Sequence, residues 1–92
     1  MNKQLLTETL KTKDTVTLFY ADWCGGCKVA MPMVNEIADK LNFKLIKINE
    51  DADLETEFAI DYYPHVILSS GGKIKHYPGL HSIKELHESI IS

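Results

Sequence analysis

The sequence contains only two cysteines, Cys24 and Cys27. A small secreted scaffold that is held together by disulfides usually carries more cysteines than this. Because the two are only three positions apart, a bond between them would close almost no loop and would add little chain-entropy stabilisation. The pair therefore indicates a chemical role and not an architectural one.

Clusters of basic residues and long apolar runs are also missing. The formal net charge is -3, and specific nucleic-acid binding usually needs a concentrated basic footprint, so no nucleic-acid partner is expected. No apolar run approaches the ~20 residues of a membrane span. The segment Met1 to Leu10 has no apolar signal-peptide core and carries Glu8. These absences predict a cytoplasmic protein that contacts no membrane.

The composition that remains is typical of a folded chain. Hydrophobic residues make up 45% and charged residues 25% of the 92 residues, which are ordinary proportions for a globular domain. A chain of this length forms one domain and not two. We therefore expect a single domain over residues 1–92.

Hydrophobic periodicity predicts alternating helices and strands. Leu6 and Leu10 recur at helical spacing, whereas Thr15 to Tyr20 is β-branched and aromatic and predicts a buried strand. Helices are expected at residues 2–11, at 28–41 with Gly25-Gly26 opening the helix, at 51–59 and from 82 onward, and strands at 15–20, 43–48, 66–69 and 73–77. Ser70-Gly71-Gly72 predicts a hairpin turn, and Ser82 with Glu85 forms a capping box for the last helix.

This order predicts an α/β fold. Two strands separated by a helix pair in parallel through a right-handed crossover, and the hairpin strands add in antiparallel fashion. The expected architecture is a four-stranded mixed sheet flanked by helices on both faces. Trp23 to Cys27 would follow the carboxyl end of the first strand, which is where open α/β sheets place their binding sites.

The spacing of the cysteines suits thiol–disulfide exchange. Cys24 would lie at a helix N-terminus, where unpaired N–H groups and the helix dipole stabilise the thiolate that attacks disulfides. Cys27 follows about one turn later on the same face and can resolve a mixed disulfide. Gly25 and Gly26 let the turn close without side-chain obstruction. Half of a zinc site and a pair of inert core cysteines stay open as alternatives.

The segment Tyr20 to Lys28, Y-A-D-W-C-G-G-C-K, resembles the active-site segment of thioredoxins. Pro32 matches the family's helix-kinking proline, Lys47 its lysine on the central strand, Pro64 its cis-proline and Gly79 the glycine after the last strand. The resemblance covers nearly the whole chain and implies the thioredoxin fold. Because the chain begins directly with a helix, the family's N-terminal strand is expected to be missing or very short.

The resemblance implies a role for each matching residue. Cys24 would be the attacking cysteine and Cys27 the resolving one, and Trp23 would cover the site. The substrate-binding surface would comprise Trp23, Gly25, Gly26, Tyr63, Pro64 and Gly79, with backbone pairing to the substrate at Tyr63. Lys47 and Pro32 would support the site.

The function implied is a protein-disulfide reductase, a thioredoxin-type electron carrier that needs no cofactor or metal. Its partners would be disulfide-containing proteins and a thioredoxin-reductase-type electron donor, and it would be a monomer. Two alternatives remain: a glutaredoxin-like enzyme that uses glutathione, and a thioredoxin-fold binding subunit without turnover. The W-C-G-G-C motif argues against the first alternative, since glutaredoxins usually carry a tyrosine in the motif.

Three positions depart from the thioredoxin pattern. Gly25-Gly26 stands where Gly-Pro is typical, so the motif should be more mobile. Leu18 stands where a buried aspartate is typical, and that acid is thought to help the resolving cysteine lose its proton. His65 follows the cis-proline where threonine is common, and the simplest expectation for it is a surface ring.

Overall fold

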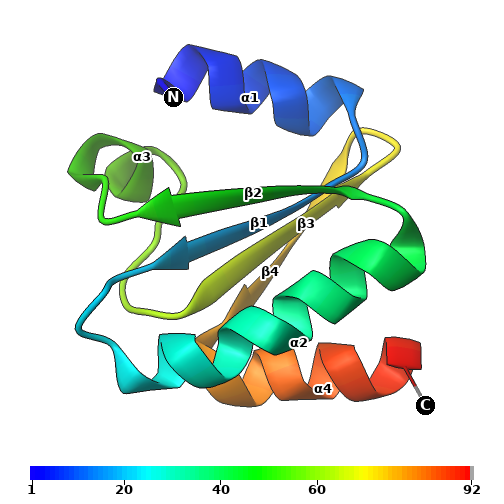
Figure 1. Cartoon of the computed structure of the whole chain (residues 1–92). Coiled ribbons are helices and arrows are strands. Elements are labelled where there is room, and N and C mark those ends of the chain that lie inside the picture. The colour runs from blue at the N-terminus through cyan, green and yellow to red at the C-terminus, as the bar shows by residue number, and fades with distance from the viewer. Residues whose placement is uncertain (92) are drawn as a thin grey trace.

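The computed structural model describes residues 1–91. Helices and strands alternate in the predicted order (Figure 1). The helices are α1 (Lys3–Thr12), α2 (Gly25–Leu41), α3 (Ala52–Glu57) and α4 (Gly79–Ile91). The strands are β1 (Thr15–Tyr20), β2 (Lys44–Asn49), β3 (His65–Ser70) and β4 (Lys73–Pro78). In the part of the chain that is described, no helix is both long and apolar enough to cross a membrane.

The four strands form one mixed sheet in the order β2-β1-β3-β4. β1 pairs with β2 in parallel, and β3 pairs in antiparallel fashion with both β1 and β4. Helices α1 and α3 cover one face of the sheet, and α2 and α4 cover the other (Figure 1). The predicted α/β architecture is therefore confirmed. Within residues 1–91, no strand precedes α1, as the helical pattern of residues 2–11 predicts.

Alternation along β1 divides the core into two layers. Val16 and Leu18 are fully buried and pack with Val34 of α2 on one face of the sheet. Phe19 is fully buried among the side chains of the other face, which include Leu6 of α1. Burying each of these side chains contributes about 1.5–3 kcal/mol to the free energy of folding. The two layers hold β1 rigidly, and the cysteine motif follows its carboxyl end.

One of the two helices beside the site begins as predicted, and the other begins earlier. α2 starts at Gly25, directly after Cys24, which lies at the helix N-terminus as predicted: it takes the extended conformation of an N-cap (φ -87, ψ 112), and its sulfur accepts the N–H of Cys27. α4 starts at Gly79, so the predicted capping box is wrong: Ser82 and Glu85 lie inside the helix. The chain enters α4 directly from β4, and the left-handed conformation of Gly79 makes the turn.

Gly79 is expected to tolerate no side chain without loss of stability. Its φ is +80, and an added Cβ would lie 3.4 Å from Cε2 of Tyr62. We expect Gly79→Ala to lower the free energy of unfolding by about 1–2 kcal/mol, because an L-residue is strained in this conformation. Urea denaturation measures the change. Gly25→Ala is the matched control, since its Cβ meets nothing within 4 Å; equal stabilities of the two variants would contradict the expectation.

Candidate active site

The two cysteines lie at the N-terminus of α2 and are joined as a disulfide, with their Cα atoms 5.3 Å apart. The backbone N–H of Cys27 donates to Sγ of Cys24 at 3.1 Å. In the reduced protein, this N–H and the positive end of the helix dipole would stabilise a thiolate at Cys24. Cys24 is 8% exposed and Cys27 2%. A partner therefore reaches Cys24 before Cys27.

Apolar side chains surround the cysteine pair. Ala21 is buried with both cysteines, and Tyr20 and Tyr63 pack against this cluster. The N–H of Cys24 donates to the carbonyl oxygen of Ala21 at 3.1 Å, which closes the turn between β1 and α2. The site thus has an apolar floor that is attached directly to the end of β1.

Trp23 and Tyr63 form an aromatic pair at the rim of the site. Trp23 is 72% exposed. Its ring meets that of Tyr63 edge-to-face, with the centroids 5.8 Å apart and the planes at 70°, an arrangement that aromatic pairs favour. A large exposed aromatic group beside a reactive pair offers a contact surface to another molecule.

The loop before β3 lies against the first turn of α2. The peptide bond between Tyr63 and Pro64 is cis, as predicted. A Cβ on Gly26 would lie 3.5 Å from Cδ of Pro64. The carbonyl oxygen of Pro64 accepts the N–H of Gly79 at 2.8 Å. Segments that are far apart in the sequence therefore meet beside the cysteines.

Most of the predicted site residues come together, and two do not. The contacts above link Cys24, Cys27, Trp23, Gly26, Tyr63, Pro64 and Gly79, and Gly25 opens the helix between the cysteines. Lys47 is exposed on β2, which is an edge strand of the described sheet, so its expected place on a central strand is wrong; Pro32 is exposed within α2. The helix continues through Pro32 as one element. The supporting roles of both residues stay predictions.

His65 is only 4% exposed, so the expectation of a surface ring is wrong. It is the first residue of β3, and its ring packs edge-on against Phe19 at 6.5 Å. Its Nε2 lies 2.8 Å from Nδ1 of His76, at hydrogen-bonding distance. Burial, and then the proximity of His76, lowers the pKa of His65 to about 4, so the ring is neutral at pH 7. Extending the alternation of β3 back by one residue would have placed His65 on the buried face.

Glu55 of α3 contacts Tyr63 in a way that the sequence did not reveal. The hydroxyl of Tyr63 donates a hydrogen bond to Oε2 of Glu55. Burial of the ring, followed by this hydrogen bond, raises the pKa of Tyr63 above its ordinary value, so the hydroxyl stays protonated. No motif predicted this contact, because it depends on how the loop after α3 returns to the site.

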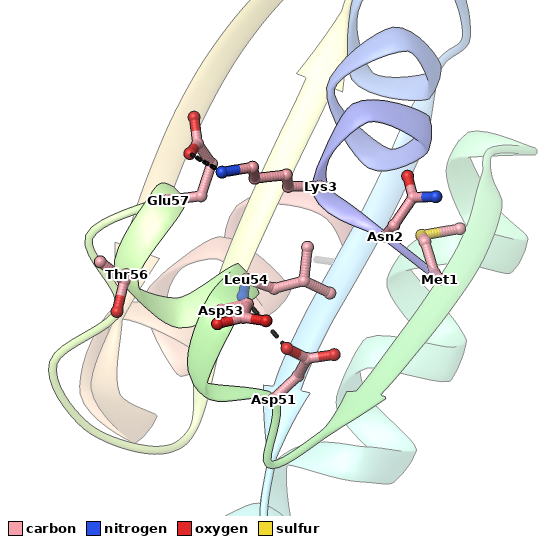
Figure 2. A pocket seen from close by; sticks show the side chains of 8 residues that line it. All are labelled: Met1, Asn2, Lys3, Asp51, Asp53, Leu54, Thr56 and Glu57. Carbon is pink, nitrogen blue, oxygen red and sulfur yellow. Dashed lines mark hydrogen bonds and ion pairs between the residues drawn. The ribbon is translucent and has the colours of Figure 1, made fainter.

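A pocket of about 470 Å³ lies between the start of α1 and α3 (Figure 2). Its lining includes the carboxylates of Asp51, Asp53 and Glu57, and Nζ of Lys3 lies 4.0 Å from Oε1 of Glu57. Neither cysteine lines it, and neither does Trp23 or any residue of the cis-proline loop. The pocket is therefore separate from the cysteine site.

A redox-active cysteine pair at the N-terminus of a helix, beside a cis-proline and at the carboxyl end of an inner strand of a mixed sheet, defines a thiol–disulfide oxidoreductase. The thioredoxin family model matches residues 1–92. The thioredoxin of Mycoplasmoides gallisepticum is 38% identical over 77 residues, which cover 79% of this chain and 77% of that protein. Thioredoxin 1 of Chlorobaculum tepidum is 33% identical over 78 residues, covering 78% and 77%.

A solved structure agrees with these relatives. The crystal structure of thioredoxin NaTrxh from Nicotiana alata has 31% sequence identity and a TM-score of 0.75, and the match covers 96% of this chain and 81% of that one. The chain belongs to the thioredoxin family. It is a thiol–disulfide oxidoreductase of the protein-disulfide reductase class.

Proposed function

We propose that Cys24 is the attacking cysteine and Cys27 the resolving one. The observation that carries this assignment is the position of Cys24 as the cap of α2, where its sulfur accepts the N–H of Cys27. Cys24 is also the more exposed of the two residues. A thiolate at a helix N-terminus is stabilised and nucleophilic. Cys27 lies about one turn behind it, within reach of a mixed disulfide.

The reaction then runs in two exchanges. The Cys24 thiolate attacks one sulfur of a substrate disulfide, which forms a mixed disulfide and releases the other substrate sulfur as a thiolate. The Cys27 thiolate next attacks Sγ of Cys24 and releases the second substrate sulfur as a thiolate. The substrate gains two electrons, and the protein leaves with its own disulfide, as in the structure.

The substrate-binding surface in this proposal is the aromatic pair together with the three glycines and the proline around the cysteines: Trp23, Gly25, Gly26, Tyr63, Pro64 and Gly79. The peptide group of Tyr63 lies just before the sheet pairing of β3, which begins at His65. An extended polypeptide can therefore pair with this backbone while its disulfide reaches Cys24.

We further propose an oligomeric state, an electron donor and a compartment for the reaction. The chain would act as a single domain over residues 1–92 and as a monomer, and it would carry electrons from a thioredoxin-reductase-type donor to disulfide-containing proteins. A reductase of this kind works where its dithiol is continually regenerated, as it is in the reducing cytoplasm. Supporting roles for Lys47 and Pro32 belong to the same proposal.

Turnover of insulin disulfides tests the proposed function. With NADPH and a thioredoxin reductase as the electron source, we expect many insulin disulfides to be reduced per molecule of protein. When glutathione and glutathione reductase replace the thioredoxin reductase, we expect little turnover. Dependence on glutathione would favour the glutaredoxin-like alternative, and failure with both donors would favour a binding subunit.

Trp23→Ala should weaken substrate reduction far more than stability. We expect kcat/KM for insulin to fall about tenfold, the size typical of a contact residue at the centre of an interface. Stability should change by no more than about 0.5 kcal/mol, because the side chain is mostly exposed. Leu5→Ala, at an exposed apolar position on α1, is the matched control and should leave kcat/KM unchanged. Normal kinetics in Trp23→Ala would contradict a docking role.

A further inference from the structure

The side chain of Tyr63 is held at both ends. Its ring packs against the buried cluster of Cys24 and Cys27, and the edge-to-face contact with Trp23 fixes its outer side. Its hydroxyl donates a hydrogen bond to Oε2 of Glu55 on α3. The orientation of the ring beside the cysteines thus depends on a residue outside the cysteine motif and outside the cis-proline loop.

Glu55 is itself fixed in place. Its Oε2 also accepts the backbone N–H of Asp51 at 3.0 Å, and Oδ1 of Asp51 accepts the N–H of Leu54 at 3.1 Å. The second of these bonds is drawn in Figure 2. The two carboxylates therefore cap the start of α3 reciprocally, in the manner of a capping box. A carboxylate bound in this way is a rigid acceptor for the hydroxyl of Tyr63.

The chemistry of this hydrogen bond also suits a redox centre. Burial, and then the carboxylate acceptor, raises the pKa of Tyr63, so the phenol stays neutral. A neutral ring can lie beside a Cys24 thiolate without electrostatic repulsion, whereas a phenolate there would disfavour the charged sulfur. A hydrogen bond from a hydroxyl to a carboxylate is one of the stronger kinds in proteins.

We propose that Glu55 is a positioning residue of the redox site: through the hydroxyl of Tyr63 it holds the aromatic pair in the orientation that receives a polypeptide substrate. This inference rests on the proposed function, in which Trp23 and Tyr63 belong to the substrate-binding surface. Glu55 touches neither the sulfurs nor the substrate. Its effect should therefore appear in substrate docking and not in the exchange reaction itself.

The first test compares a protein substrate with a small one. We expect Glu55→Ala to raise KM for insulin about fivefold, the effect of one lost hydrogen bond, with a much smaller change in kcat. The rate with oxidised mercaptoethanol, a small neutral disulfide that does not need the aromatic surface, should stay unchanged. Glu55→Gln keeps an acceptor oxygen and should restore KM. Glu57→Ala removes the same charge from the same helix without a bond to Tyr63 and should behave as wild type.

The second test separates positioning from helix capping. Trp23 is the only tryptophan, so its near-ultraviolet circular dichroism reports the aromatic pair and should change in Glu55→Ala and in Tyr63→Phe. In a double-mutant cycle, Glu55→Ala should have little further effect on KM once Tyr63→Phe is present. Full additivity, or an unchanged KM in Glu55→Ala, would overturn the inference. A wild-type protein that fails to reduce insulin would refute the proposed function instead.

Discussion

Replacing Cys24 with serine is expected to reduce insulin turnover to the uncatalysed background, whereas Cys27→Ser is expected to trap the substrate. A serine hydroxyl at position 24 cannot form the nucleophile that the cap of α2 stabilises, so no exchange begins. In Cys27→Ser the first exchange still occurs, but no second thiol is present to release the substrate. Non-reducing gels and intact-protein mass measurement should show a covalent adduct in Cys27→Ser that dithiothreitol reduces.

The adduct must pass through Cys24 if the assignment is correct. The double variant with serine at both positions is the control, and it should form no adduct under the same conditions. The disulfide joins residues only three positions apart and closes almost no loop. Losing it should therefore change stability little in any of the three variants relative to the reduced wild type. An adduct in Cys24→Ser, together with an inactive and adduct-free Cys27→Ser, would reverse the roles of the cysteines.

The strands and their pairing could be predicted because their signals are local. The β-branched and aromatic run from Thr15 to Tyr20 forms β1 with the predicted bounds, and Ser70-Gly71-Gly72 joins β3 and β4 as expected. The cysteine motif lies between β1 and α2, the crossover helix that the parallel pairing of β1 with β2 requires. The cysteine pair therefore lies at the end of β1, where the order of the elements predicts it.

The start of α4 and the supporting contacts could not be predicted in the same way. The place of Cys24 at the start of α2 was predicted, but its capping of the helix was not, because sulfur is not among the oxygen-bearing side chains that usually mark an N-cap. Gly79 starts α4 because it lies against Pro64, a neighbour only in the folded chain. The bond between Glu55 and Tyr63 likewise depends on the path of the loop after α3. Such long-range contacts leave no pattern in the sequence.

Leu18→Asp is expected to accelerate the resolving step and to destabilise the fold. Leu18 is fully buried and packs in one cluster with Ala30, one helical turn after Cys27. A carboxylate there could accept the proton of Cys27 through water, and Lys47, its register partner on β2, would help to keep it charged. We expect the mixed disulfide to be resolved about tenfold faster at neutral pH. The free energy of unfolding should fall by about 3–5 kcal/mol.

The matched control is Leu18→Asn, which introduces similar size and polarity but no proton acceptor. Both variants should lose stability in urea denaturation, so a faster resolving step in Leu18→Asp alone can be attributed to the carboxylate. Single-turnover reduction should be followed from about pH 6 to 9, which brackets the ~8.5 of an ordinary thiol. The wild type and Leu18→Asn should resolve faster as the pH rises, because only the thiolate of Cys27 attacks. The rate of Leu18→Asp should depend less on pH; a profile parallel to that of Leu18→Asn would mean that an acid at this position does nothing for Cys27.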